Sequence, residues 1–172
     1  MAEPLPRRWG HVQAVAAKAE SLRPVLDGDG DLLVAAAWLH DVGYAPPVQD
    51  TGFHPIDGGR YLRSFGAEER LCRLVANHSG AVYEAEIRGL ADELAEFPDE
   101  RSLARDGLWY CDMTTSPVGQ PITFDDRLAE ICQRYGPDHL VPRAITAASD
   151  EIRAAIAAVE DAAHEHGVTV GV

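Results

Sequence analysis

The dipeptide His40-Asp41 is the feature of this sequence that most clearly suggests chemistry. It follows the apolar stretch 32–39, which predicts a buried helix. An imidazole and a carboxylate are costly to bury there unless they are paired or bound to a metal ion. Neighbouring positions on a helix diverge by about a quarter to a third of a turn, since a turn holds about 3.6 residues. We therefore expect Asp41 to reach between two ions while His40 binds one of them.

Further histidines and an aspartate occupy similar settings, in predicted helices or at helix ends beside apolar residues. They are His11, His54, His78 and Asp112. Taken singly, a histidine of this kind is more often a core or helix-end residue. His54 would then cap a helix that begins at Pro55, and His78 would face a helix C-terminus. Taken together, imidazoles and carboxylates without thiolates suit Fe, Mn, Ni, Co or Zn rather than Ca.

The order of these residues resembles that of the HD-domain metal-dependent phosphohydrolases. A lone His, an HD dyad in an apolar helix and a distant Asp form the family pattern, and two intervening histidines mark its two-metal subgroup. The matching segments are RRWGHVQAVA with His11, AAAWLHDVGY with His40 and Asp41, TGFHPIDGGRYL with His54, LVANHSG with His78 and LWYCDMTTSP with Asp112. The resemblance covers about residues 7–117 and implies an all-α core whose helices converge on the metals.

The resemblance also implies one or two divalent transition-metal ions as cofactors. By carry-over, the first ion is held by His11, His40, Asp41 and Asp112, and the second by Asp41, His54 and His78, with Asp41 bridging. Two adjacent ions lower the pKa of a bridging water, so a metal-bridging hydroxide is the expected nucleophile, with Asp41 and His40 as catalytic residues. We expect a hydrolase that cleaves a small phosphate ester or anhydride, nucleotides included.

One departure from the family leaves the leaving-group acid unassigned. The chain reads HDVGY, with Tyr44 where several hydrolytic subgroups carry Lys. The only lysine, Lys18, lies seven positions after His11 and hence on the same helical face. We name Lys18, Tyr44 and Arg60 as candidate substrate contacts, with Arg8 as a further cationic candidate.

Two other functions fit the same ligand set. Some six-ligand HD proteins hold a mixed-valence di-iron pair and use O₂ to oxidise their substrate, and the missing lysine gives this alternative weight. A non-catalytic metal-binding sensor is the third reading, which an open coordination position would argue against. The sequence alone leaves these functions open.

The bulk properties restrict the partners. A formal net charge of -13 repels a phosphate backbone, so we expect no nucleic-acid polymer as a partner. A small phosphorylated substrate remains compatible, because bound metal reverses the local field. No apolar stretch approaches the roughly 20 residues that span a bilayer, and the N-terminus lacks a signal-type run, so we expect a cytoplasmic protein without a membrane partner. Oligomeric state is not visible in the sequence.

Helical periodicity dominates the elements that must position these residues. The predicted helices span about 8–26, 32–40, 55–65, 68–78, 82–97 with a break at Gly89, 102–113, 123–136, and 141 or 149 to 166. Thr123 and Asp126 resemble a capping box at the start of one of them. With 172 residues, the chain is expected to form one all-α, single-domain HD-type helical bundle over 1–172. Its motif-bearing core would be 7–117 and its C-terminal helical extension 121–166.

Overall fold

The computed structural model describes residues 5–170, and helices account for the regular structure in that range. The helices are α1 (Pro6–Ser21), η1 (Arg23–Val25), α2 (Gly30–Leu39), η2 (Val42–Tyr44), α3 (His54–Ser64), α4 (Glu69–Ala76), η3 (His78–Gly80), α5 (Ala81–Arg88), α6 (Ala91–Leu94), α7 (Leu103–Met113), α8 (Phe124–Tyr135), α9 (Leu140–Ala147) and α10 (Ser149–Glu165). An isolated bridge joins Thr115 and Pro121. The all-α prediction is therefore confirmed. No helix of the described residues is long and apolar enough to cross a bilayer.

Helix boundaries follow local signals, with differences from the predicted ranges. The first α-helix ends at Ser21 rather than near residue 26, and the 3-10 turn η1, which contains Pro24, follows it. The predicted helix 82–97 is divided at Gly89, whose φ of 73° suits a residue without Cβ. Thr123 caps α8, because its Oγ1 accepts the backbone N–H of Asp126 at 3.1 Å.

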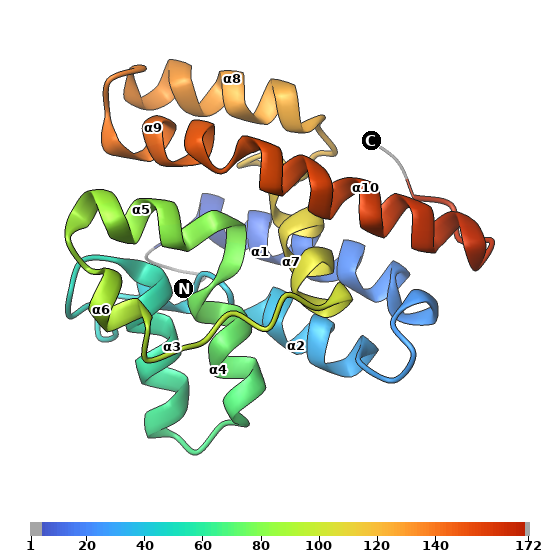
Figure 1. The fold of residues 1–172 in the computed structure, drawn as a ribbon, viewed down its shortest axis with the longest axis horizontal. Coiled ribbons are helices and arrows are strands. Elements are labelled where there is room, and N and C mark those ends of the chain that lie inside the picture. The colour runs from blue at the N-terminus through green and yellow to red at the C-terminus, as the bar shows by residue number, and fades with distance from the viewer. Residues whose placement is uncertain (1–4, 171–172) are drawn as a thin grey trace.

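Figure 1 shows three groups of helices across the molecule. The C-terminal helices α8, α9 and α10 lie along one side, and α3 and α4 lie on the opposite side. Helices α1, α2 and α7 lie between them, where α1 packs on α2 and α10 packs along α7. The segments that carry the chemical residues therefore surround the middle of the fold. The division into a core at 7–117 and an extension at 121–166 stays a prediction.

Helix α7 joins two hydrophobic clusters. Leu108 and Cys111 belong to a cluster built from α1, α2, α7 and α10. Trp109 and Met113 belong to a second cluster, with the apolar faces of α8, α9 and α10. Because both faces of α7 are packed, its C-terminal end, which carries Asp112, is held in place.

Helix α3 approaches the turn after the His40-Asp41 dyad closely. A Cβ atom added at Gly43 would lie 2.0 Å from the carbonyl oxygen of His54 and 2.8 Å from the backbone nitrogen of Gly58. Contacts under 3.0 Å force a backbone to move. Gly43 therefore sets the distance between the dyad and the first turn of α3.

We predict that Gly43→Ala destabilises the protein by about 1–3 kcal/mol or more, because the added methyl overlaps backbone that cannot yield easily. The free energy of unfolding in urea measures this effect. Gly10→Ala is the matched control: apart from its chain neighbours and the backbone of its own helix, no described atom lies within 4 Å of its added Cβ. Since Gly10 lies inside α1, alanine should raise stability by about 0.5–1 kcal/mol. Equal stability of the two variants would contradict this account of the contact.

Candidate metal centre

The structure brings the six residues named as metal ligands together in two adjacent groups. His11, His40 and Asp112 form one group, and Asp41, His54 and His78 form the other. Within each group, one potential ligand atom from each residue lies within 4.8 Å of the others. The two groups come from segments far apart in the sequence, so the tertiary fold assembles them.

Helix ends supply most of these side chains. His40 is the C-cap of α2, His54 begins α3, His78 follows α4 in η3, and Asp112 lies in the last turn of α7. His11 lies within α1 and is buried. A helix end changes the chain direction within a residue or two, so it can direct a side chain into a space that the helices enclose.

Backbone carbonyls orient three of the four imidazoles. The pairs are His11 Nδ1 with Ser116 O at 3.0 Å, His40 Nδ1 with Ala37 O at 2.8 Å, and His78 Nδ1 with Val75 O at 2.6 Å. A carbonyl oxygen only accepts, so each Nδ1 donates its hydrogen. In the neutral ring, the Nε2 lone pair is then free and directed into the cluster. Metal-binding histidines are commonly fixed in this way by a bond from the other ring nitrogen.

The donor arrangement fits a metal ion. Nε2 of His40 is buried and has no hydrogen-bond partner among the described residues. It lies 3.5 Å from Asp41 Oδ2 and 4.0 Å from Asp112 Oδ1. Nε2 of His11 likewise faces Asp112 Oδ1, at 2.9 Å. Lone pairs that face each other repel unless a proton or a cation lies between them, and imidazole with carboxylate is a donor set for transition metals.

Asp41 lies between the two groups. Its Oδ2 faces His40, whereas its Oδ1 lies 3.5 Å from Nε2 of His54. The carboxylate therefore presents one oxygen to an imidazole of each group. Arg8 Nη1 also donates to Oδ2 at 2.6 Å, so a guanidinium partly balances this buried charge.

The charges of the centre shift its pKa values. Burial alone would raise the pKa of Asp41, but His40, Arg8 and His54 lower it below its ordinary range. Burial would likewise raise the pKa of Asp112, and its hydrogen bond with His11 helps to lower it well below the usual value. Both carboxylates are thus ionised at neutral pH.

The imidazoles of His11, His54 and His78 differ in the direction in which their pKa values shift. Burial, with the nearby His78, lowers the pKa of His54 well below its ordinary value. Burial and the neighbouring His40 also lower the pKa of His78. Burial would lower the pKa of His11 as well, but Asp112 raises it above the usual value. His54 and His78 are therefore neutral near pH 7, as metal ligands must be.

Tyr44 covers the outer side of the centre. Its ring stacks on His54 with 3.9 Å between ring centroids, and the Arg8 guanidinium lies 3.5 Å from the centroid of the Tyr44 ring. This stack fixes the plane of His54 and holds Arg8 against Asp41. Tyr44 lines the cavity described below, so its position allows the substrate contact that the sequence suggested.

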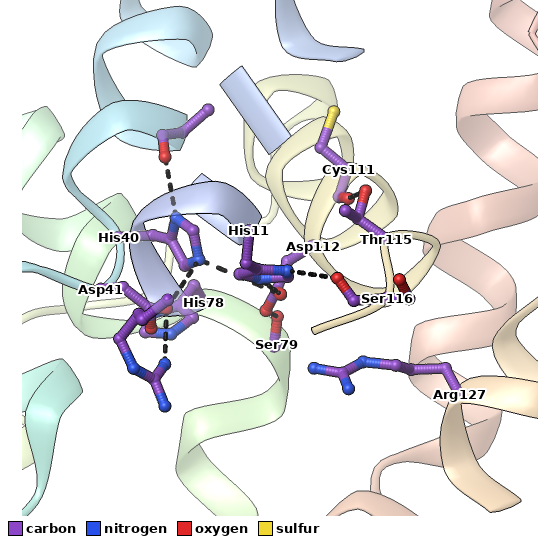
Figure 2. Close-up of polar contacts among 12 residues, drawn as sticks. His11, His40, Asp41, His78, Ser79, Cys111, Asp112, Thr115, Ser116 and Arg127 are labelled. Atoms are coloured by element: carbon purple, nitrogen blue, oxygen red, sulfur yellow. Dashed lines mark hydrogen bonds and ion pairs between the residues drawn. The ribbon is translucent and has the colours of Figure 1, made fainter. Parts of the chain in front are cut away.

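A cavity of about 560 Å³ opens onto the centre. His11, Asp41, His54, His78 and Asp112 line it, whereas His40 is fully buried behind them. Figure 2 shows His11, Asp112 and Ser79 close together beside the imidazole of His40. Ser79 and Gly80 also line the cavity. Ser79 has a φ of 49°, unusual for a residue with Cβ, and its Oγ donates to Asp112 Oδ2.

Two of the predicted substrate contacts lie elsewhere. Lys18 Nζ donates to the carbonyl oxygen and to Oγ1 of Thr114, both at 2.7 Å, so it ties α1 to the end of α7. Arg60 pairs with Glu96 at the surface. Neither Lys18 nor Arg60 lines the cavity, because nearer polar partners hold both side chains.

The cavity contains cationic residues that sequence reasoning missed. Arg7 from α1, together with Arg127 and Arg134 from α8, lines the wall beside the metal-ligand candidates. Arg127 lies three residues after Phe124 and four before Ile131, hence on the apolar face of α8. The sequence offered one signal for Arg127, its position on the apolar face of a predicted helix. Charged residues are seldom buried there unless they are paired.

Comparisons with known proteins agree with these residues. A family model described as HD domain matches residues 8–109, which stops just before Asp112 and α8. Ribonuclease Y of Rubrobacter xylanophilus is 30% identical over 97 residues. That match covers 56% of this chain but 18% of the relative, so the chain corresponds to a small part of that protein. No solved structure matches the chain. With the family match over more than half its length, this chain belongs to the HD-domain family.

Proposed function

We propose that the protein is a metal-dependent phosphohydrolase that acts on a small phosphate ester or anhydride. The position of Asp41, with one carboxylate oxygen toward an imidazole of each group, carries this proposal. Such a position suits a residue shared by two ions. Membership of a family whose members are generally phosphohydrolases supports the same reaction class.

In this proposal, one divalent ion would be held by His11, His40, Asp41 and Asp112, and the other by Asp41, His54 and His78. Ions of this kind lower the pKa of water and polarise a phosphoryl oxygen, so no Ser or Cys nucleophile is required. Asp41 and His40 then contribute as ligands. Fe, Mn, Ni, Co and Zn all suit the donor set.

The surrounding residues hold the ligands in place. Ser79 donates to one oxygen of Asp112, which leaves the other oxygen toward His11. The Tyr44 ring shields one face of His54 from water. Arg8 donates to Oδ2 of Asp41, the oxygen that also faces His40, and it lines the cavity, where its charge favours an anionic substrate.

The size of the cavity favours a small substrate over RNA. A space of about 560 Å³ lies in the range that small-molecule sites occupy, about 300–1,000 Å³, and suits a compound the size of a nucleotide. The relative named a ribonuclease shares 18% of its own length with this chain. A formal net charge of -13 disfavours the long-range attraction that an RNA backbone needs. We therefore propose a small phosphorylated compound rather than a polymer as substrate.

The first test joins metal content to hydrolysis. Protein purified without chelator should contain up to two transition-metal ions per chain and release phosphate from a panel of small phosphate esters and nucleotides. His40→Gln should lose metal and lower kcat/KM at least about 100-fold, since even residues behind metal ligands contribute 10–100-fold. His166→Gln is the control: its Nδ1 also contacts a backbone carbonyl oxygen, that of Ala162 at 2.8 Å, but it lies exposed at the end of α10. This control should keep full metal content and activity.

The same preparation separates the alternatives. A metal-loaded protein that hydrolyses no member of the panel contradicts the proposal. Electron paramagnetic resonance of the partly reduced protein then identifies a mixed-valence di-iron pair, the mark of an oxygenase. A redox-silent, catalytically inert metal indicates a sensor. Cleavage of RNA oligonucleotides with no cleavage of small esters overturns the choice of substrate.

The second test uses Arg8. Arg8→Gln should destabilise the metal-free protein by about 1–3 kcal/mol, because the buried Asp41 carboxylate loses a charged donor. The difference from the wild type should shrink when Zn²⁺ or Mn²⁺ is added, since bound ions neutralise Asp41. Urea unfolding with and without metal measures both values. Arg153→Gln, which breaks a surface pair with Asp125, should cost less than about 1 kcal/mol in either condition. A loss at Arg8 that metal leaves unchanged argues against Asp41 as a ligand.

A further inference from the structure

Arg127 stands out on α8 because it occupies the buried face of the helix. Phe124 and Ile131, on the same face, are each 5% exposed and belong to the cluster that packs on α7. The Arg127 side chain is 11% exposed. Burying a guanidinium costs free energy unless its N–H groups find acceptors. An apolar residue would serve packing better here, so a structural role alone does not account for this arginine.

The guanidinium of Arg127 is incompletely paired. Its Nη1 donates to Glu130 Oε2 at 2.7 Å. Its Nε is buried and has no acceptor among the described residues. Arg134 also donates to Glu130, so that one carboxylate is shared by two arginines. This group of three charged side chains therefore keeps a positive charge and a free donor.

Arg127 points toward the candidate metal centre. Figure 2 shows its side chain extending from α8 toward the side of the centre where His11, Asp112 and Ser79 lie. Arg127 and these three residues line the same cavity. Arg127 therefore presents its guanidinium on the wall of the cavity that opens onto the centre.

The charge of the cavity lining differs from that of the whole chain. Its arginines and its carboxylates are equal in number, so their formal charges cancel. They are Arg7, Arg8, Arg127 and Arg134, and Asp41, Glu84, Asp112 and Glu130. The whole chain carries -13. Bound divalent ions would make the lining positive, so this cavity would suit an anion although the protein as a whole is acidic.

We infer that α8 supplies the substrate-anion subsite of this cavity, with Arg127 as the residue that binds the phosphoryl group, and that α9 borders this subsite. A guanidinium offers paired donors that match phosphate oxygens. Ile131, Val141 and Ile145 line the same cavity and form an apolar surface for the organic part of the substrate. The substrate is thus a phosphorylated compound with an apolar or planar organic group. This inference rests on the proposed function, because it names the substrate contact of the same centre.

The test measures binding rather than turnover. Inorganic phosphate is titrated calorimetrically into the metal-loaded protein, and metal content is measured on the same samples. Arg127→Gln should weaken phosphate binding about tenfold or more, as expected for a lost charge-assisted pair, with unchanged metal content. Arg127→Lys should recover part of the affinity. The control Arg153→Gln removes one charge from the C-terminal helices outside the cavity and should change affinity less than about twofold.

Glu130→Gln should change the affinity for phosphate in the opposite direction to Arg127→Gln. Glu130 occupies Nη1 of Arg127 and repels an anion, so its removal should tighten phosphate binding several-fold. Equal weakening in Glu130→Gln and Arg127→Gln would show a purely structural ion pair and overturn the inference. Unchanged affinity in Arg127→Gln overturns it as well. A wild-type protein that binds no metal contradicts the proposed function instead, so the two failures are distinct.

Discussion

The arrangement of the site depends on one electrostatic constraint, the burial of the Asp41 and Asp112 carboxylates beside imidazole nitrogens, one of which, Nε2 of His40, has no hydrogen-bond partner among the described residues. The Nδ1 atoms of His11, His40 and His78 donate to backbone carbonyls, so the Nε2 atoms of the same rings face inward. Nε2 of His11 lies 2.9 Å from Asp112 Oδ1, and Nε2 of His40 lies 3.5 Å from Asp41 Oδ2 and 4.0 Å from Asp112 Oδ1. Cations bound among these groups would balance the buried negative charge and pair with the free nitrogen. A metal centre would therefore make the buried groups compatible with a stable core.

The helical bundle meets this constraint by directing helix ends at a common point. Helix α7, packed on both faces, holds Asp112, and the close approach at Gly43 fixes His54 against the dyad. Arg8 and Tyr44 then hold the outer side of Asp41 and His54. Packing that lies away from the reacting groups thus determines the positions of the ligand atoms.

The sequence predicted the all-α fold and the six residues that meet, because the spacing of the HD pattern reflects which helices must converge. It named Lys18 and Arg60 as substrate contacts, but neither lines the cavity, and Arg60 pairs with Glu96 at the surface. For Lys18, the helical face shared with His11 indicates a direction but not a distance. Lys18 lies about 10 Å along α1 from His11, at about 1.5 Å per residue, and there it meets Thr114. Arg127 was not predicted as a cavity residue. The position of α8 beside the cavity depends on the long-range packing of Phe124 and Ile131, and local periodicity does not reveal such packing.

The central claim is that two cations occupy the space between these side chains. Anomalous diffraction from crystals grown with Mn²⁺ or Zn²⁺ tests it most directly. The account predicts two anomalous peaks, one among His11, His40 and Asp112 and one among Asp41, His54 and His78, with an Asp41 oxygen beside each. The absence of any peak in this region, with the side chains unmoved, would contradict the claim.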